Sequence, residues 1–503
     1  MKNNNTFRNP AFSRDYNDDG TIEDGFGSSE LDRVDMILES PPSKTALGSG
    51  VPIQQYNRVL GTLSVAAITF FYGCGGPFGS EEVVRLGGPL PGILALVIYP
   101  LVYTIPYGFV IVELCSAFPE DGGFTIWATN AFGYFWGVQI GYWAWVAGVV
   151  AGAIYPTYLI MQAQAYLGLG EVSKTTDTIL RLCFALCLAI PTLAPAKAFG
   201  RGAITFLLLA IISATIFSIW GFASFSSDNH ISVVRHKHST IANFTDPEEY
   251  ENGIENSVIT IINAAFWNFD GIQMASVFGG QVANPSRVYS RAIWITMAST
   301  ISIYFFPLFG TLLSDSVSWW TFSRPTYVDA GLAIGGQFLR VVMIIASFIS
   351  SVGLFMGNLF CQSFQIAGMA DNRLLPQGLA VRSQMTGSPY RSVFATLSVS
   401  MLLGIVGTDS LLPVTNTFAA LVSLTIFLSA IRLRFTLPYI PRPTKLPGGT
   451  PGLIVVSLIP MCICGLLIGR NITLGVQEGL MVAGFLMPGL LYGFFRSRQY
   501  QFS

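Results

Sequence analysis

The sequence predicts an all-α polytopic membrane protein with twelve transmembrane helices, and three observations support this class. The 503-residue chain is 51% hydrophobic and only 11% charged, whereas a soluble domain carries roughly 25% charged residues. Apolar segments recur along the chain at roughly the 20-residue length that a helix needs to cross the hydrocarbon core. Two of these segments are interrupted by residues that weaken helices, a pattern typical of secondary transporters built from inverted repeats.

The apolar segments follow a polar N-terminal region. Residues 1–50 carry nine acidic and five basic residues. Such a segment buries too little apolar surface to offset its ordering entropy, so we expect a disordered tail. The expected spans then lie near residues 58–86 (broken), 91–117, 135–163, 176–196, 203–225, 257–281 (broken), 289–313, 337–367, 392–408, 410–431, 452–469 and 476–495.

The first interruption is the segment 73–79, with the sequence GCGGPFG. Inside a membrane, a broken helix is tolerated only where the freed backbone groups are buried in protein or line a cavity. Glycine lets a ligand approach the main chain closely, although glycines also allow helices to pack closely without any ligand. We expect the main chain of this break to line a substrate site, with the candidates Gly73, Cys74, Gly75, Gly76 and Pro77.

The second interruption is the segment 266–271, with the sequence FWNFDG, in the sixth span. Half-helix N-termini at the two breaks offer unpaired N–H groups to an anion, and C-terminal ends with unwound carbonyls attract a cation. Aromatic rings add a wall that attracts cations through its faces. The site candidates of this break are Phe266, Trp267, Asn268, Phe269 and Asp270.

Asp270 and Glu113 are the acidic residues that these boundaries place well inside a span. An ionisable group at membrane depth costs about 2.5 to 3.5 kcal/mol on insertion scales and is a functional hypothesis by default. Both are candidates for proton coupling or for pairing with a substrate amine, and Asp270 is the better candidate. Glu113 also fits an inner gate. The alternative for Glu113 is a structural pair with a cytoplasmic arginine such as Arg201 or Arg373.

Two more acidic residues follow the first break. Glu81 and Glu82 are expected either to draw cations toward the outer vestibule or to form a plain solvated helix end.

The distribution of basic residues sets the expected orientation. With both termini in the cytoplasm, 19 of the 27 Lys and Arg residues fall on the cytoplasmic side, as the positive-inside rule requires. We expect a multi-pass protein of the plasma membrane, with an internal membrane as the alternative.

Several short motifs between residues 56 and 496 resemble the amino acid-polyamine-organocation transporter superfamily. The first break is similar to the Gly-Gly-Pro-Phe-Gly element of the eukaryotic polyamine and amino acid uptake transporters, including the plant polyamine:proton symporters. The other matching segments are Glu113-Leu114, FPEDGGF at 118–124, Trp267-Asn268, NPSR at 284–287, ADNRLLP at 370–376, RPTKLP at 442–447 and Thr450-Pro451-Gly452.

This resemblance implies a leucine-transporter-like fold and alternating access around a midplane site. It divides the chain into a first five-helix repeat (56–225), a second, inverted repeat (257–431) and two accessory helices (452–495), with helices 1 and 6 broken. The implied activity is import of a cationic substrate, a polyamine or a basic amino acid such as arginine, with H⁺ as the coupling ion.

The third span departs from the plant transporters. They carry an acidic residue and an amide before Ala-Leu-Tyr-Pro, whereas this chain has Ala151-Gly152 there, followed by Ala153-Ile154-Tyr155-Pro156. Asp270 takes a place where those transporters have an amide, so the charge has moved between helices. The aromatic residues around this span fit the lipid–water interface, and Tyr155 is kept as a site candidate.

Two classes of function remain open. The first is a secondary transporter, with a neutral amino acid transporter or an exchanger of the same fold as the nearer alternative. The second is a membrane receptor that senses amino acids without appreciable flux. We expect no enzyme activity, metal, cofactor or nucleic-acid partner. The resemblance places the cysteine that anchors a heavy chain in heteromeric relatives in the outer loop after the third span. That loop contains no cysteine, so we expect no disulfide-linked heavy chain.

Overall fold

The computed structural model describes residues 58–167, 173–225, 247–323, 326–406, 412–473 and 476–501. The expected tail, residues 1–50, lies outside them. The described residues fold into helices, without a named β-strand. The α-helices are α2 (Thr62–Gly73), α3 (Glu81–Gly87), α4 (Pro89–Tyr99), α5 (Ile105–Ala117), α6 (Phe124–Phe132), α7 (Tyr134–Leu167), α8 (Lys174–Ala189), α9 (Ala196–Ala223), α12 (Pro247–Phe269), α13 (Pro285–Ser314), α14 (Thr326–Asp371), α15 (Tyr390–Val406), α16 (Leu412–Thr436), α17 (Gly449–Thr473) and α18 (Val476–Gln501).

Each predicted segment contains a helix, and nine helices in the described part are long and apolar enough to cross a membrane. The protein is therefore an integral multi-pass membrane protein, while the number of twelve spans stays a prediction. Helix α2 is too short to span because it stops at the first break. Helix α14 is two helices merged across a kink at Gly336, where φ is +64°. The short helix α6 was not predicted.

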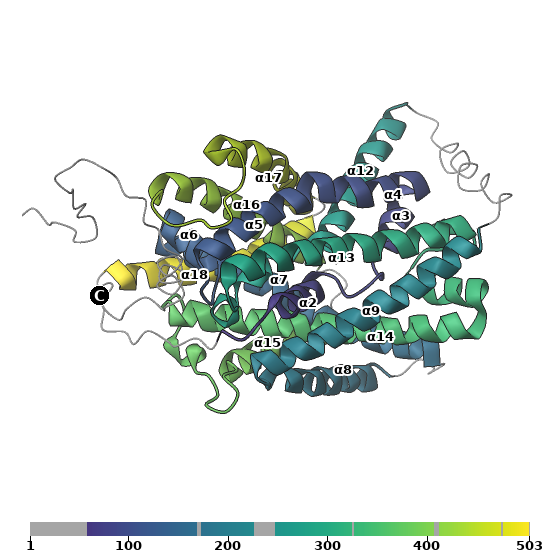
Figure 1. The fold of residues 1–503 in the computed structure, drawn as a ribbon, viewed down its shortest axis with the longest axis horizontal. Coiled ribbons are helices and arrows are strands. Elements are labelled where there is room, and N and C mark those ends of the chain that lie inside the picture. The colour runs from purple at the N-terminus through teal and green to yellow at the C-terminus, as the bar shows by residue number, and fades with distance from the viewer. Residues whose placement is uncertain are drawn as a thin grey trace, which may run out of the picture. The chain divides into compact units, whose positions relative to one another are not determined.

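Helix α2 lies at the centre of the described bundle. It packs against α9, α13 and α14, and α7 packs against α14 and α16. Figure 1 shows the long helices α9, α13 and α14 running past the short α2. The buried residues of α2, from Val65 to Phe71, are apolar except for Thr69. The buried end of α2 is therefore held in place from several sides.

A polar network at the loop between α5 and α6 joins distant parts of the chain. Asp121 is completely buried. Its Oδ1 accepts the Gly280 N–H at 2.8 Å, and its Oδ2 accepts from Arg382 at 2.9 Å. Arg382 also donates to Asp371 at 2.9 Å. Burial outweighs both favourable partners and raises the pKa of Asp121 to about 6.

This pKa predicts a pH-dependent stability. An unfolded aspartate has a pKa of about 3.9, so the folded state binds more protons between that value and about 6. The free energy of unfolding therefore rises as pH falls through this window. Between pH 7.5 and 5, the wild type should gain about 1 kcal/mol relative to Asp121→Asn, which cannot titrate. Thermal unfolding of both proteins in detergent at the two pH values measures this difference, and a constant difference would contradict it.

Candidate functional site

The two breaks meet in backbone contact. Helix α2 ends at Gly73, and Cys74 is extended, with φ −136° and ψ 121°. Helix α12 continues through Phe269, so the second interruption begins at Asp270 and not at Phe266 as predicted. Gly271 follows with φ +116°. A Cβ on Gly73 would overlap the carbonyl oxygen of Asp270, so only glycine lets the two helix ends come this close.

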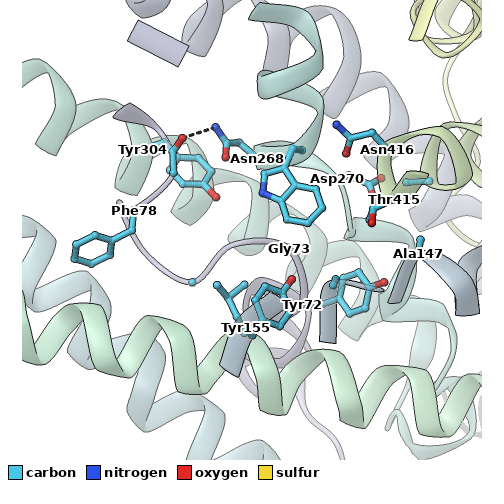
Figure 2. Close-up of a pocket in the computed structure, with 16 residues that line it drawn as sticks. Tyr72, Gly73, Phe78, Ala147, Tyr155, Asn268, Asp270, Tyr304, Thr415 and Asn416 are labelled. Carbon is cyan, nitrogen blue, oxygen red and sulfur yellow. Dashed lines mark hydrogen bonds between the residues drawn. The ribbon is translucent and has the colours of Figure 1, made fainter. Parts of the chain in front are cut away.

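Side chains from neighbouring helices satisfy the carbonyls that the first break frees. The hydroxyl of Ser350 in α14 donates to the Gly75 carbonyl. The Asn268 amide in α12 donates to the Gly79 carbonyl at 3.2 Å, drawn as the dashed line in Figure 2. Gly79 has φ +108°, which favours glycine. Because buried carbonyls need partners, these contacts fix the path of the broken segment.

A cavity of about 60 Å³, measured as space open to the centre of a water molecule, lies at this meeting point. Helices α2, α7, α12, α13, α14 and α16 all contribute to its wall. Phe78 and Asp270 lie on opposite sides of the site in Figure 2. Its lining residues are Tyr72, Gly73, Gly75, Phe78, Gly79, Ala147, Ala151, Tyr155, Trp267, Asn268, Asp270, Tyr304, Leu354, Thr415, Asn416 and Ala419.

Asp270 is the single charged residue among the described residues that line this cavity. Its carboxylate accepts two hydrogen bonds from the Gln273 amide, at 3.2 and 3.3 Å, while the Gln273 carbonyl accepts the Gly271 N–H at 3.2 Å. The C-terminal ends of α2 and α12 converge here, and each adds partial negative charge. The arrangement can therefore bind a cation or exchange a proton.

The cavity brings together only part of the predicted site. Gly73, Gly75, Tyr155, Trp267, Asn268 and Asp270 line it. Cys74 and Phe269 line a second, smaller cavity of about 20 Å³. Gly76 and Pro77 line neither cavity. Phe266 lines neither cavity. Its ring packs edge-on against Tyr103, with ring centroids 5.7 Å apart.

Sequence reasoning missed several lining residues. Tyr72 and Phe78 flank the glycines of the first break and could have been found from that proximity. Thr415 and Asn416 belong to the polar run Thr415-Asn416-Thr417 near the start of an apolar span, which is a usable signal. Tyr304 stands in an apolar stretch of α13 and gives no such signal.

Glu81 corrects one expectation. It is only 1% exposed, and its Oε2 accepts the Gly79 N–H at 2.7 Å. Glu82 is exposed and pairs with Arg85. The interpretation as a solvated helix end therefore holds for Glu82 and is wrong for Glu81, which places a buried carboxylate beside the first break.

Glu113 lies away from both cavities in a buried ion pair. Its two carboxylate oxygens accept from Arg434 in α16 at 2.7 and 2.5 Å. Oε2 also accepts the Leu446 N–H at 2.8 Å, and Arg442 lies 3.4 Å from Oε1. The arginine partners are thus Arg434 and Arg442, and the expected pairing with Arg201 or Arg373 was wrong. This geometry favours the structural interpretation over proton coupling.

The Glu113 pair predicts a strong stability effect. Glu113→Gln would leave the buried guanidinium of Arg434 without a counter-charge, and breaking such a pair costs about 3–5 kcal/mol. We expect a large loss of thermal stability in detergent, with Glu82→Gln as the exposed control that changes little. Wild-type stability in Glu113→Gln would contradict this role.

The contact at Gly73 gives a second prediction. Gly73→Ala forces the α2 end away from Asp270, and overpacking of this kind costs about 1–3 kcal/mol. Transport should fall sharply because the cavity wall moves. Gly202→Ala in α9 is the matched control, because a Cβ there meets nothing within 4 Å. Equal uptake by the two variants would show that the contact is not needed.

The helical bundle and its central cavity, with one charged residue in the described lining, are those expected of an integral membrane transporter. Residues 60–491 match the amino acid permease family, and the chain therefore belongs to this family. This confirms the resemblance seen in the motifs.

The chain is also similar over most of its length to proteins of plants. A probable polyamine transporter of Arabidopsis thaliana is 26% identical, covering 93% of this chain and 90% of that one. The polyamine transporter RMV1 of the same plant is 26% identical, and the match covers 83% of this chain and 82% of RMV1. The polyamine transporter PUT1 of Oryza sativa subsp. japonica is 24% identical, and the match covers 84% of this chain and 76% of PUT1. The protein is thus a membrane transporter for amines or amino acids, and not an enzyme.

Proposed function

We propose that this protein is a secondary transporter that imports a cationic substrate, a polyamine or a basic amino acid such as arginine, in symport with H⁺. The observation that carries the proposal is the position of Asp270 in the central cavity, at the point where two helix C-termini converge. A carboxylate and two negative helix ends attract an amine. Among the described lining residues, no Lys, Arg or His offsets this charge.

The lining of the cavity supports a cationic amine. Trp267, Tyr155 and Tyr72 offer aromatic surface to a cation. Ala151 lines the cavity, at a position of the third span where the resemblance to the plant transporters implies an acidic residue. Asp270 therefore supplies the carboxylate from α12 instead. A basic amino acid stays an alternative to a polyamine, because backbone N–H groups at the helix breaks can bind a substrate carboxylate without a positive side chain.

Alternating access, proton coupling and the repeat architecture complete the proposal. Helices α2 and α12, one in each half, both stop at the same buried point, as expected for two five-helix repeats in inverted orientation. In symport the substrate and the proton cross together, so Asp270 would take up H⁺ from the outer side and release it on the cytoplasmic side. The two helix C-termini and the aromatic rings would hold the amine while Asp270 is protonated. We place both termini in the cytoplasm, from the Lys and Arg distribution, and the protein in the plasma membrane.

Uptake assays test this proposal directly. Cells that express the protein are given labelled putrescine, spermidine, arginine and leucine at pH 5.5 and 7.5, with Asp270→Asn alongside. We expect uptake of one or more cationic substrates, faster at pH 5.5 and at least about tenfold lower in the variant, because the loss of one ionic contact in a partly buried site exceeds 1.4 kcal/mol.

Asp329→Asn is the matched control, because Asp329 is exposed at the start of α14. This variant should transport at the wild-type rate. Uptake of leucine alone, unchanged by Asp270→Asn, would overturn the proposal in favour of a neutral amino acid transporter. Binding of substrate by purified protein without uptake into liposomes would favour a receptor.

A further inference from the structure

Asp270 lines both cavities of the site. The second cavity has a volume of about 20 Å³ on the same measure, against about 60 Å³ for the first, and it shares Gly73, Asn268 and Asp270 with it. A buried water needs about 10–15 Å³ and two to four polar partners. The second cavity therefore has room for one water molecule and none for a polyamine.

Threonines make the second cavity polar. Thr69, Thr104, Thr296 and Thr300 line it together with Asp270. The Thr69 hydroxyl donates to the Val65 carbonyl at 2.8 Å, and the Thr296 hydroxyl lies within hydrogen-bonding distance of the Ala66 and Ala292 carbonyls, at 3.1 and 3.0 Å. Their protons are committed to the backbone, so these two oxygens can only accept hydrogen bonds from a bound molecule.

Thr104 differs from these residues. It is 3% exposed, and within the described part of the chain its Oγ1 has no hydrogen-bond partner. A buried hydroxyl without a partner costs about 1–3 kcal/mol and needs an explanation. Thr104 also ends a π-helical turn, η1 (Pro100–Thr104), between α4 and α5. Such turns occur often at functional sites.

We propose that the second cavity binds one water molecule, which accepts from Thr104 and donates to Asp270, and that this water sets the pH dependence of transport. The inference rests on the proposed role of Asp270 as the coupling carboxylate. The water contacts Asp270 from a cavity separate from the one the substrate occupies. It stabilises the charged carboxylate whether or not an amine is bound, so Thr104 is a positioning residue that acts through the water.

The groups around Asp270 allow a clean test. Tyr72, Tyr99, Tyr103, Tyr107 and Cys464 interact with it electrostatically. Cys74 lines the second cavity with Asp270, and Tyr155 and Tyr304 line the first. The ordinary pKa values of tyrosine and cysteine lie above 8, so these groups stay neutral in the acidic to neutral range. Asp121, which titrates near pH 6 in the distant network, is the same in every Thr104 variant and cancels in the comparison.

The test measures putrescine uptake by purified protein in liposomes between pH 5 and 8. Thr104→Val keeps the shape of the side chain and removes its hydroxyl, so the water loses its donor. The carboxylate then holds its proton to higher pH, and we expect the pH of half-maximal uptake to rise by about 0.5 unit or more, with KM within about twofold of the wild type. Thr104→Ser should restore the wild-type profile.

Thr311→Val is the control for folding, because the buried Thr311 hydroxyl bonds only within α13, to the Pro307 carbonyl, away from both cavities. Thermal unfolding in detergent tests whether each variant is folded. A Thr104→Val profile that matches the wild type, or a Thr104→Ser profile shifted as far as that of Thr104→Val, would overturn the inference even if Asp270→Asn abolishes uptake.

A second readout does not depend on the transported substrate. A cryo-EM map that resolves ordered waters should show density between Thr104 and Asp270 in the wild type and none in Thr104→Val. If the wild type does not transport putrescine but the density is present, the proposed substrate fails and the water site stands. Absence of the density in the wild type overturns the water site whatever the substrate.

Discussion

The ends of α2 and α12 touch through their backbones at Gly73 and Asp270, and the central cavity exists because neither helix continues past this point. In an apolar environment every freed N–H and C=O must find a partner inside the protein. Ser350 and Asn268 provide partners for the carbonyls of the first break. The remaining polarity of the helix ends faces the two cavities, and this concentrates negative potential around one carboxylate.

Two carboxylates in the apolar part of the chain illustrate how partners decide the role of a charge. Glu113 is bound by Arg434 and the Leu446 N–H, with Arg442 close by, so its charge is neutralised by the scaffold. Asp270 has a neutral amide, Gln273, as its side-chain partner in the described hydrogen bonds. The Glu113 charge ties α5 to α16 and the following loop. The Asp270 charge is left to meet a ligand or a proton.

The sequence predicted where the chain breaks but not how the break is used. The composition of 73–79 is incompatible with a continuous helix, so a break there follows from local chemistry. The extent of the second break was overestimated because Phe266, Trp267 and Asn268 do not themselves disrupt a helix. Only Asp270 and Gly271, with φ +116° at the glycine, end it. Which face of α12 each aromatic residue takes depends on the helices packed around it.

Sequence reasoning could not predict side-chain partners from distant parts of the chain, because these contacts also depend on how the helices pack. Glu113 and Arg434 are 321 residues apart, and no local pattern connects them. Glu81 looked like a solvated helix end because it precedes Glu82 and Arg85, yet packing buries it. Neighbours in sequence do not determine the dielectric environment of a side chain.

The sequence by itself determined that this is a polytopic helical membrane protein of a transporter family with two interrupted helices, because hydrophobic length, glycine and proline act locally on the backbone. Only the tertiary structure decided that the breaks meet and that Asp270 rather than Glu113 lines the central cavity. It also decided that Thr104 lines the second cavity together with Asp270. These are contacts between segments far apart in the chain, and they depend on how whole helices pack.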